Sequence, residues 1–276
     1  HAVIGPLRQL QKEGFRVTEL SPNSDGIINL DSLKDAFEED TFLVSVMLAN
    51  NEIGVLQPIS QIASLCESYG ITFHSDAVQG FGNVPIDFKN IGIDFASISG
   101  HKIYGPKGIG LLIAKENCNL TPLQWGGNQE NGIRPGTLPV PLVIGFVKAA
   151  ELALEYLEVN YKYLKNLRDQ LWQGLINEIP DLILNGSLER RLPNNLNFTV
   201  NGVIGSRLHK KVRPHISCSS GSACSNGEAS HVLRALGRTK EEAEASLRLS
   251  IGRNTTIEHV ELAVDLITNK VRNLRE

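Results

Sequence analysis

The sequence predicts an α/β protein: a mostly parallel sheet with helices on both faces, followed by a smaller α+β domain. Two observations favour it. Apolar runs alternate with amphipathic stretches over the first half, and from about Val140 a long helical stretch replaces this alternation. The 276 residues, 41% of them hydrophobic, are enough for one large or two moderate domains. We expect residues 1–155 to form the larger domain and residues 156–276 the smaller one.

The first half contains the expected βα alternation. Apolar spacing predicts a helix over residues 6–14, ended by Gly14, and a helix over residues 58–70, which opens with Pro58 and ends at Gly70. A short helix is expected over residues 31–37, with Asp31 as its cap. Strands are expected over residues 15–20, 41–49, 71–76, 95–99 and 109–114.

The second half has a different pattern. A helical stretch over residues 142–175 joins the two predicted domains. Strand-like segments follow at residues 196–200 and 216–220, and residues 256–276 read as a terminal helix. This order predicts the smaller α+β domain.

Composition excludes several classes of protein. The 27 basic and 30 acidic side chains give a formal charge of -3, which gives no sign of a nucleic-acid or membrane partner. No apolar stretch approaches the length of a bilayer span. The four cysteines are scattered without a CxxC pair, which argues against a disulfide scaffold or a metal site and favours a reducing compartment, the cytoplasm. They are Cys66, Cys118, Cys218 and Cys224.

Polar side chains follow three of the predicted strands. In an open α/β sheet, ligands bind at the carboxyl ends of the strands. Each loop also has an ordinary structural interpretation, since Asn pairs form turns, an Asp after a strand often caps a helix, and a loop lysine is usually solvated. The candidates are Asn50 and Asn51 in "LANNEIG", Asp76 and Gln79 in "HSDAVQG", and Ser99, His101 and Lys102 in "SGHK".

The third loop does not fit a nucleotide triphosphatase. Gly100 and Gly105 are followed by Pro106 and Lys107, and no Ser or Thr is placed to hold magnesium. The three loops together supply what pyridoxal phosphate requires: a lysine for a Schiff base, a carboxylate for the pyridine nitrogen, and hydroxyl and imidazole donors for the phosphate. We expect Lys102 to be partly desolvated, since this disfavours its ammonium form and frees the amine as a nucleophile.

The chain resembles the cysteine desulfurases, in the class-V aminotransferase group of fold-type I pyridoxal phosphate enzymes. The resemblance covers essentially the whole chain and implies the fold-type I architecture. It also implies an enzyme that takes sulfur from L-cysteine, leaving L-alanine and an enzyme persulfide. The motifs that carry it, in family order, are "NNEIGVL", "HSDAVQ", "SGHKIYGPKGIG", "RPGTLP", "SSGSAC" and "LRLSIGR".

The resemblance also implies roles for the residues of the cofactor site. Lys102 would bind the cofactor covalently and later move protons between substrate and cofactor. Asp76 would form a salt bridge with the pyridine nitrogen. Gln79 and Asn51 would hydrogen-bond the phenolic oxygen or the substrate's side of the cofactor. The phosphate would be held by Ser99 and His101.

Other implied roles concern the substrate, the sulfur and a second subunit. Arg248 would bind the α-carboxylate of the substrate. Cys224 would accept the sulfur as a thiolate, with His101 or the substrate amine as its proton acceptor. Thr137 would reach the phosphate of a neighbouring subunit, which implies a homodimer. The persulfide would pass to an iron–sulfur scaffold or another acceptor, and Cys66, Cys118 and Cys218 would be structural.

The sequence departs from the family in two places. Members open with a segment that carries a Gly-Thr phosphate loop and a histidine two residues before the Ala-Val pair. Here only His1 precedes Ala2, so we expect a truncated chain in which His1 does not stack on the cofactor. The segment between Cys224 and "VLRALG" is also shorter than usual, which leaves the identity of the sulfur acceptor open.

Three alternatives stand beside the desulfurase. A selenocysteine lyase or an aminotransferase would use the same Lys102 and Asp76, although a plain aminotransferase needs no thiol like Cys224. The third alternative is a truncated, non-catalytic homologue, which the missing opening segment favours.

Overall fold

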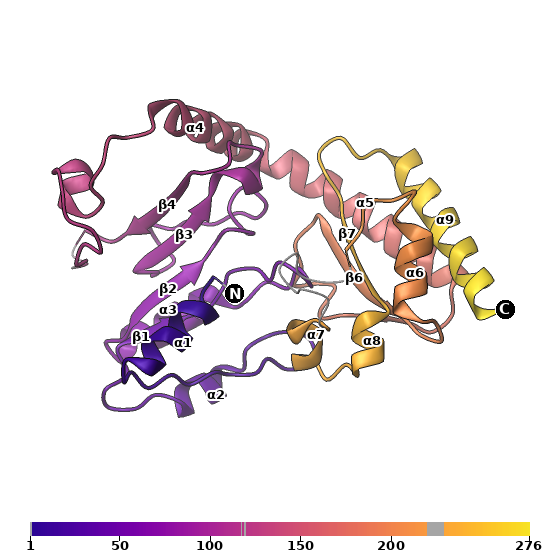
Figure 1. Cartoon of the computed structure of the whole chain (residues 1–276), viewed down its shortest axis with the longest axis horizontal. Helices are drawn as coiled ribbons and strands as arrows, with labels where there is room; N and C mark the ends of the chain where they lie inside the picture. The colour runs from indigo at the N-terminus through magenta and orange to yellow at the C-terminus, as the bar shows by residue number, and fades with distance from the viewer. Residues whose placement is uncertain (1, 117, 119, 220–228) are drawn as a thin grey trace. The chain divides into compact units, whose positions relative to one another are not determined.

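The computed structural model describes residues 2–116, 118, 120–219 and 229–276 (Figure 1). It divides into two compact units. The parallel-sheet unit comprises residues 41–48 and 59–158, and the antiparallel-sheet unit comprises residues 1–40, 49–58 and 159–276. Residues 1–40 and 49–58 therefore group with the C-terminal part of the chain, whereas the sequence places them in the larger domain. The division into a larger domain of residues 1–155 and a smaller one of residues 156–276 stays a prediction.

The parallel-sheet unit has four strands in the order β1-β2-β3-β4. β1 (Leu43–Ser45), β2 (Thr72–Asp76) and β3 (Phe95–Ser99) pair in parallel, and β4 (Gly110–Ala114) pairs with β3 antiparallel. The connection from β3 to β4 contains only the short 3₁₀ helix η1 (Gly100–Ile103). A connection this short suits an antiparallel pair, since a parallel partner would require a longer crossover. The α/β class with a mostly parallel sheet is confirmed.

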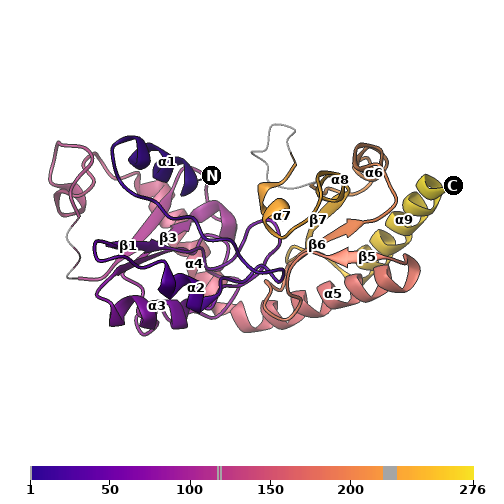
Figure 2. The same cartoon turned by 90° about the horizontal axis from the view of Figure 1, so that it is seen from below.

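The two faces of this sheet differ in character. Phe73, Ser75, Ala96 and Ile98 alternate along β2 and β3 and are buried. Helix α3 (Ile59–Ser68) packs against β2, and Figure 2 shows it along one face of the strands. The intervening side chains of β2 and β3 are polar and only half-buried near the carboxyl ends. Two further helical segments complete the unit, η2 (Gln129–Gly132) and α4 (Val140–Glu155), and α4 contacts η1.

The antiparallel-sheet unit has its core around β6. β5 (Leu182–Leu184), β6 (Asn195–Val200) and β7 (Ser246–Ser250) pair antiparallel in that order, and every residue of β6 is buried. Figure 2 shows α5 on one side of these strands and α6 and α8 on the other. Its helices are α1 (Ile4–Lys12), α2 (Leu30–Asp35), α5 (Leu157–Glu178), α6 (Gly205–Val212), α7 (His231–Ala235), α8 (Lys240–Glu244) and α9 (Ile257–Arg275).

Several sequence-based expectations are wrong in detail. Residues 15–20 form no strand, because four of the six are exposed and no strand lies beside them in the described part of the chain. Asn29, not Asp31, caps α2 by accepting a hydrogen bond from Ser32 N at 2.9 Å. The long helix breaks at Tyr156 into α4 and α5. Residues 216–219 form only an isolated bridge from Ser219 to Arg248.

A tight turn at residues 50–54 enters the core of the antiparallel-sheet unit. Asn50 Oδ1 accepts hydrogen bonds from Glu52 N at 2.8 Å and Ile53 N at 3.0 Å. Gly54 closes the turn with a φ of 71°, and a Cβ there would lie 2.6 Å from the Asn195 side chain on β6. Glycine is required at this position both for the left-handed backbone and for the close approach. No helix in the described part of the chain is long and apolar enough to cross a membrane.

Replacing Gly54 by Ala should destabilise this unit more than the same change at Gly237. Both glycines have positive φ, 71° and 85°, and each alanine would carry a backbone strain of about 1–2 kcal/mol. Only the alanine at Gly54 also collides with a neighbour, since a Cβ at Gly237 meets nothing within 4 Å. Urea denaturation followed by circular dichroism measures both free energies of unfolding. Equal losses would show that the contact with Asn195 is unimportant.

Candidate active site

The predicted site residues fall into two groups, one in each unit. Asp76, Gln79, Ser99, His101, Lys102 and Thr137 belong to the parallel-sheet unit. Asn51 and Arg248 belong to the antiparallel-sheet unit. Cys224, the predicted sulfur acceptor, and His1 lie outside the described residues.

Asp76 stands at the carboxyl end of β2. It is the last residue of that strand and lies opposite Ser97 of β3. Its Oδ1 accepts a hydrogen bond from Val78 N at 3.0 Å, which fixes the orientation of a half-buried carboxylate. A carboxylate held in this way suits a cationic nitrogen, as the prediction for the pyridine ring requires.

A row of hydroxyl and imidazole groups crosses the same face beside Asp76. Ser45 Oγ lies 2.8 Å from His74 Nδ1, and His74 Nε2 lies 3.0 Å from Ser97 Oγ. Burial lowers the pKa of His74, and the charge of Asp76 opposes that shift. The neutral ring therefore prevails near neutral pH, with one nitrogen donating and the other accepting. His74 is not among the residues predicted from the sequence, although its spacing of two residues from Asp76 puts both on one face of the strand.

The loop after β3 presents Ser99, His101 and Lys102. Ser99 Oγ lies 2.9 Å from His101 Nδ1, so this hydroxyl and imidazole already form one cluster. Lys102 is exposed, and the expected partial desolvation of its ammonium group is therefore wrong for this chain. The reason is local: η1 buries Gly100 and Ile103, and the two residues between them face outward.

Helix α4 packs against the loop that follows β3. A Cβ at Gly100 would lie 3.2 Å from Phe146 of α4 and 3.1 Å from Pro106 O. Across the same contact, a Cβ at Gly145 would lie 3.2 Å from Pro106. Such close contacts leave little room for the loop to shift, so packing at Gly100 helps to fix the backbone that carries Lys102.

Gln79 and Thr137 are the remaining predicted residues of this unit. Gln79 is half-buried, and its backbone oxygen accepts a hydrogen bond from Asn83 Nδ2 at 3.0 Å. Thr137 is exposed between η2 and α4. The same connection is stabilised by Gly136 N, which donates to Gln129 Oε1 at 3.1 Å. Gln79 therefore lies in the turn that follows Asp76, and Thr137 lies on a separate loop.

Arg248 and Asn51 are brought together in the antiparallel-sheet unit. Arg248 lies on β7, and its Nη1 donates to Asn51 O at 3.0 Å. Its backbone also pairs with Ser219, since Arg248 N donates to Ser219 O at 2.7 Å and Ser219 N donates to Arg248 O at 3.2 Å. The guanidinium is half-buried and oriented, with further N–H groups that can bind a carboxylate.

Glu52, next to Asn51, is buried, with 1% of its surface exposed. One carboxylate oxygen accepts a hydrogen bond from Ser230 Oγ at 2.5 Å. Its backbone oxygen accepts from Asn195 Nδ2 at 3.2 Å and Asn197 Nδ2 at 3.0 Å. Glu52 is not among the residues predicted from the sequence, because a partner 178 residues away leaves no local pattern.

Burial makes two of the described cysteine thiols poor nucleophiles. Burial raises the pKa of the Cys66 thiol to about 11, and it also raises the pKa of Cys218 against the opposing charge of Arg213. Cys118 Sγ lies 3.9 Å from Asp94 O. Among the described residues, no cluster of His, Cys, Asp or Glu could hold a metal ion.

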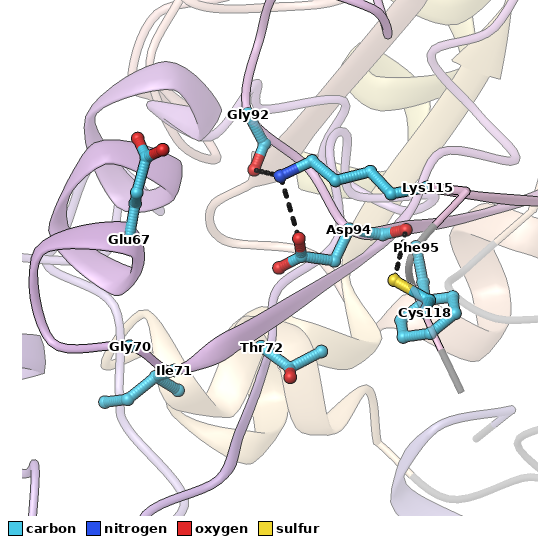
Figure 3. Close-up of a pocket in the computed structure, with 9 residues that line it drawn as sticks. All are labelled: Glu67, Gly70, Ile71, Thr72, Gly92, Asp94, Phe95, Lys115 and Cys118. Carbon is cyan, nitrogen blue, oxygen red and sulfur yellow. Dashed lines mark hydrogen bonds and ion pairs between the residues drawn. The ribbon is translucent and has the colours of Figure 1, made fainter. Parts of the chain in front are cut away.

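A separate pocket of about 410 Å³ lies at the amino ends of β2 and β3 (Figure 3). Two of the charged residues that line it are paired with each other. Lys115 Nζ forms an ion pair with Asp94 Oδ1 at 2.8 Å, and Asp94 Oδ2 accepts from Phe73 N at 2.8 Å. Asp76 and Ser99 stand at the opposite, carboxyl ends of these strands. The pocket is therefore distinct from the predicted cofactor residues.

The residues at the carboxyl ends fit pyridoxal phosphate as a donor set. One unit holds an oriented carboxylate, a hydroxyl–imidazole pair and an exposed lysine at one edge of its sheet. These groups match the pyridine nitrogen, the phosphate and the aldehyde of the cofactor in chemical type.

The raised pKa of Cys66 predicts slow alkylation. At pH 8 about 1 in 1,000 of such thiols is ionised, against about a quarter for an unfolded thiol. Iodoacetamide at pH 8 should modify Cys66 at least about 100-fold more slowly in the folded protein than in urea, and the rate should rise with pH. Peptide mass spectrometry measures the rate at each cysteine. Equal rates in folded and unfolded protein would contradict the burial of this thiol.

Comparison with known proteins identifies the family. The model of aminotransferase class-V matches residues 1–262. Cysteine desulfurase IscS of Rickettsia felis is 46% identical over 278 residues, covering 99% of this chain and 68% of that protein. A solved NifS-like protein superposes with a TM-score of 0.91 at 33% identity over 99% of this chain and 73% of that one.

A further solved structure, SspA in complex with cysteine, has a TM-score of 0.77 at 34% identity over 90% of this chain and 70% of that one. The family match extends over nearly the whole chain, and the relative from Rickettsia felis is well above the identity at which folds are shared. This chain belongs to the aminotransferase class-V family.

Proposed function

We propose that the chain acts as a cysteine desulfurase, releasing sulfur from L-cysteine with pyridoxal phosphate, the cofactor that members of its family use. The observation that carries the proposal is the set of Asp76, Ser99, His101 and Lys102 at one edge of the parallel-sheet unit. It gains support from the relative named cysteine desulfurase and from the structural relative solved with cysteine.

The chain's own residues perform distinct tasks toward the cofactor. When bound, pyridoxal phosphate supplies an electron sink for negative charge at the α-carbon of the amino acid. Asp76 keeps a proton on the pyridine nitrogen, because a carboxylate stabilises the cation beside it. Ser99 and His101 donate hydrogen bonds to the phosphate. Lys102 would bind the aldehyde carbon of the cofactor covalently, and its amine would accept the α-proton of the substrate.

Two residues orient the substrate. Arg248 binds the α-carboxylate of L-cysteine through its guanidinium, which Asn51 O already holds in place. Asn51 and Gln79 hydrogen-bond the substrate and the phenolic oxygen of the cofactor. Binding of the carboxylate orients the substrate, and orientation of this kind contributes strongly to rate.

Cys224 takes the sulfur. Its thiolate attacks the sulfur of the bound cysteine, so that an S–S bond forms while the bond between that sulfur and the β-carbon breaks. The electron pair left on the substrate is protonated. The balance is L-cysteine plus a thiol giving L-alanine plus a persulfide on Cys224. The persulfide then passes its outer sulfur to a protein acceptor, such as an iron–sulfur scaffold, in the cytoplasm.

A homodimer is the proposed working form. Helix α4 exposes an apolar stripe, in which Val140, Ile144 and Val147 are 59%, 63% and 47% exposed. Thr137 lies just before this helix, where it could reach the phosphate bound by a partner subunit. Large apolar patches on a helix surface mark interfaces.

Sedimentation velocity should give a dimer, and a monomer at micromolar concentration would contradict this part of the proposal.

Replacing Cys224 by Ala should lower sulfide release from L-cysteine in the presence of a reductant at least about 100-fold, since the proposal gives the attack on the substrate sulfur to that thiol. The visible absorbance of the bound cofactor should remain. Cys118→Ser is the matched control and should keep full sulfide release. Unchanged turnover in Cys224→Ala would overturn the role of that thiol.

The unmodified protein separates the remaining alternatives in the same assay. Cofactor absorbance without sulfide release would favour an aminotransferase or, if selenide is released from selenocysteine, a selenocysteine lyase. The absence of both signals would favour a non-catalytic homologue.

A further inference from the structure

Two described residues flank the segment that carries Cys224, and each is held by the region that binds the substrate in our proposal. On the N-terminal side, Ser219 pairs with the backbone of Arg248 through hydrogen bonds of 2.7 and 3.2 Å. On the C-terminal side, Ser230 donates to the Glu52 carboxylate at 2.5 Å. Glu52 directly follows Asn51, whose backbone oxygen binds the Arg248 guanidinium. All of these residues belong to the antiparallel-sheet unit.

The hydrogen bond between Glu52 and Ser230 is shielded from water. Glu52 is 1% and Ser230 3% exposed, so the carboxylate has little access to water. A hydroxyl that donates to a carboxylate makes a charge-assisted hydrogen bond, which is stronger than a neutral one. Ile53, Leu233 and Leu236 form an apolar cluster around the same place, which strengthens the interaction by excluding solvent.

Ser230 is also the N-cap of α7. Its Oγ accepts a hydrogen bond from Leu233 N at 3.2 Å while its hydroxyl hydrogen goes to Glu52. One side chain thus fixes the first turn of α7 to the turn at residues 50–54. That turn is itself held to β6 by Asn195 and Asn197. The start of α7 therefore has its position set by the strand that pairs with Arg248.

We propose that Glu52 is a positioning residue: by holding Ser230 it fixes the C-terminal end of the cysteine-bearing segment relative to Arg248. A thiol tethered between two fixed points has a higher effective concentration at the substrate than one whose tether is released at one end. This inference rests on the proposed function for its effect on sulfur transfer. The anchor itself rests only on the described contacts.

The test compares Glu52→Gln, Ser230→Ala and the double variant with the unmodified protein. Glutamine keeps the size of the side chain but removes the charge that strengthens the bond. In a single turnover, persulfide formation on Cys224, followed by mass spectrometry, should slow about 10-fold in each single variant. The double variant should be no slower than Ser230→Ala, because in this proposal Glu52 acts only through the hydroxyl that Ser230→Ala removes. Cofactor absorbance and the L-cysteine concentration for half-saturation should stay within about twofold.

Thr239→Ala is the matched control. Thr239 caps α8 in the same unit through a hydrogen bond from Glu242 N at 3.1 Å and is exposed. Its loss should lower stability by about 1 kcal/mol without slowing persulfide formation. Amide hydrogen exchange gives a second readout. In Glu52→Gln the Leu233 amide should exchange at least about fivefold faster, whereas in Thr239→Ala only the Glu242 amide should do so.

Three outcomes would overturn the inference: an unchanged rate in Glu52→Gln, multiplying effects in the double variant, or unchanged exchange at Leu233. If the unmodified protein forms no persulfide, the proposed function fails instead. The exchange measurement then still decides whether Glu52 holds the start of α7.

Discussion

The parallel pairing of β2 with β3 is the constraint on which the proposed cofactor site depends. This register sets Asp76 opposite Ser97, so Asp76 and the loop that begins at Ser99 meet at one edge of the sheet. A slip by one residue would turn the polar face of either strand toward the apolar core. Ser45, His74 and Ser97 oppose such a slip, since their hydrogen bonds join three strands at one register. The same interactions that align the strands thus align the chemistry.

In the antiparallel-sheet unit, the turn at residues 50–54 aligns the predicted substrate-binding residues. The turn uses backbone oxygens for binding: Asn51 O holds Arg248, and Glu52 O receives two asparagine side chains from β6. Gly54 allows the close approach that these bonds require. A short segment that is distant in sequence from β6 and β7 therefore sets the orientation of a cationic side chain on β7. Buried polar groups satisfied in this way define one arrangement rather than several.

Much of this organisation is predictable from the sequence, and the exceptions have physical reasons. The strands at residues 71–76 and 95–99 were recognisable because buried parallel strands read as short apolar runs that end in polar residues. Residues 15–20 alternate as a strand would, yet they form none, since a strand also needs a neighbour to pair with. Asn29 and Asp31 are both good caps, and only the backbone geometry decides between them. Glu52 and His74 were missed because their partners lie on other strands or helices. The exposure of Lys102 follows from the packing of Gly100 against α4, which composition does not reveal.

The central claim is that Lys102 is the residue to which pyridoxal phosphate attaches. Lys107 is the natural comparison, because it lies on the same connection between β3 and β4 and is also exposed. The direct measurement is to load the protein with pyridoxal phosphate, reduce it with borohydride so that the lysine–cofactor bond becomes permanent, and map the modified peptide by mass spectrometry. The account predicts modification at Lys102 at close to one cofactor per chain, with Lys107 unmodified. Label on Lys107, or label spread over many lysines, would contradict it.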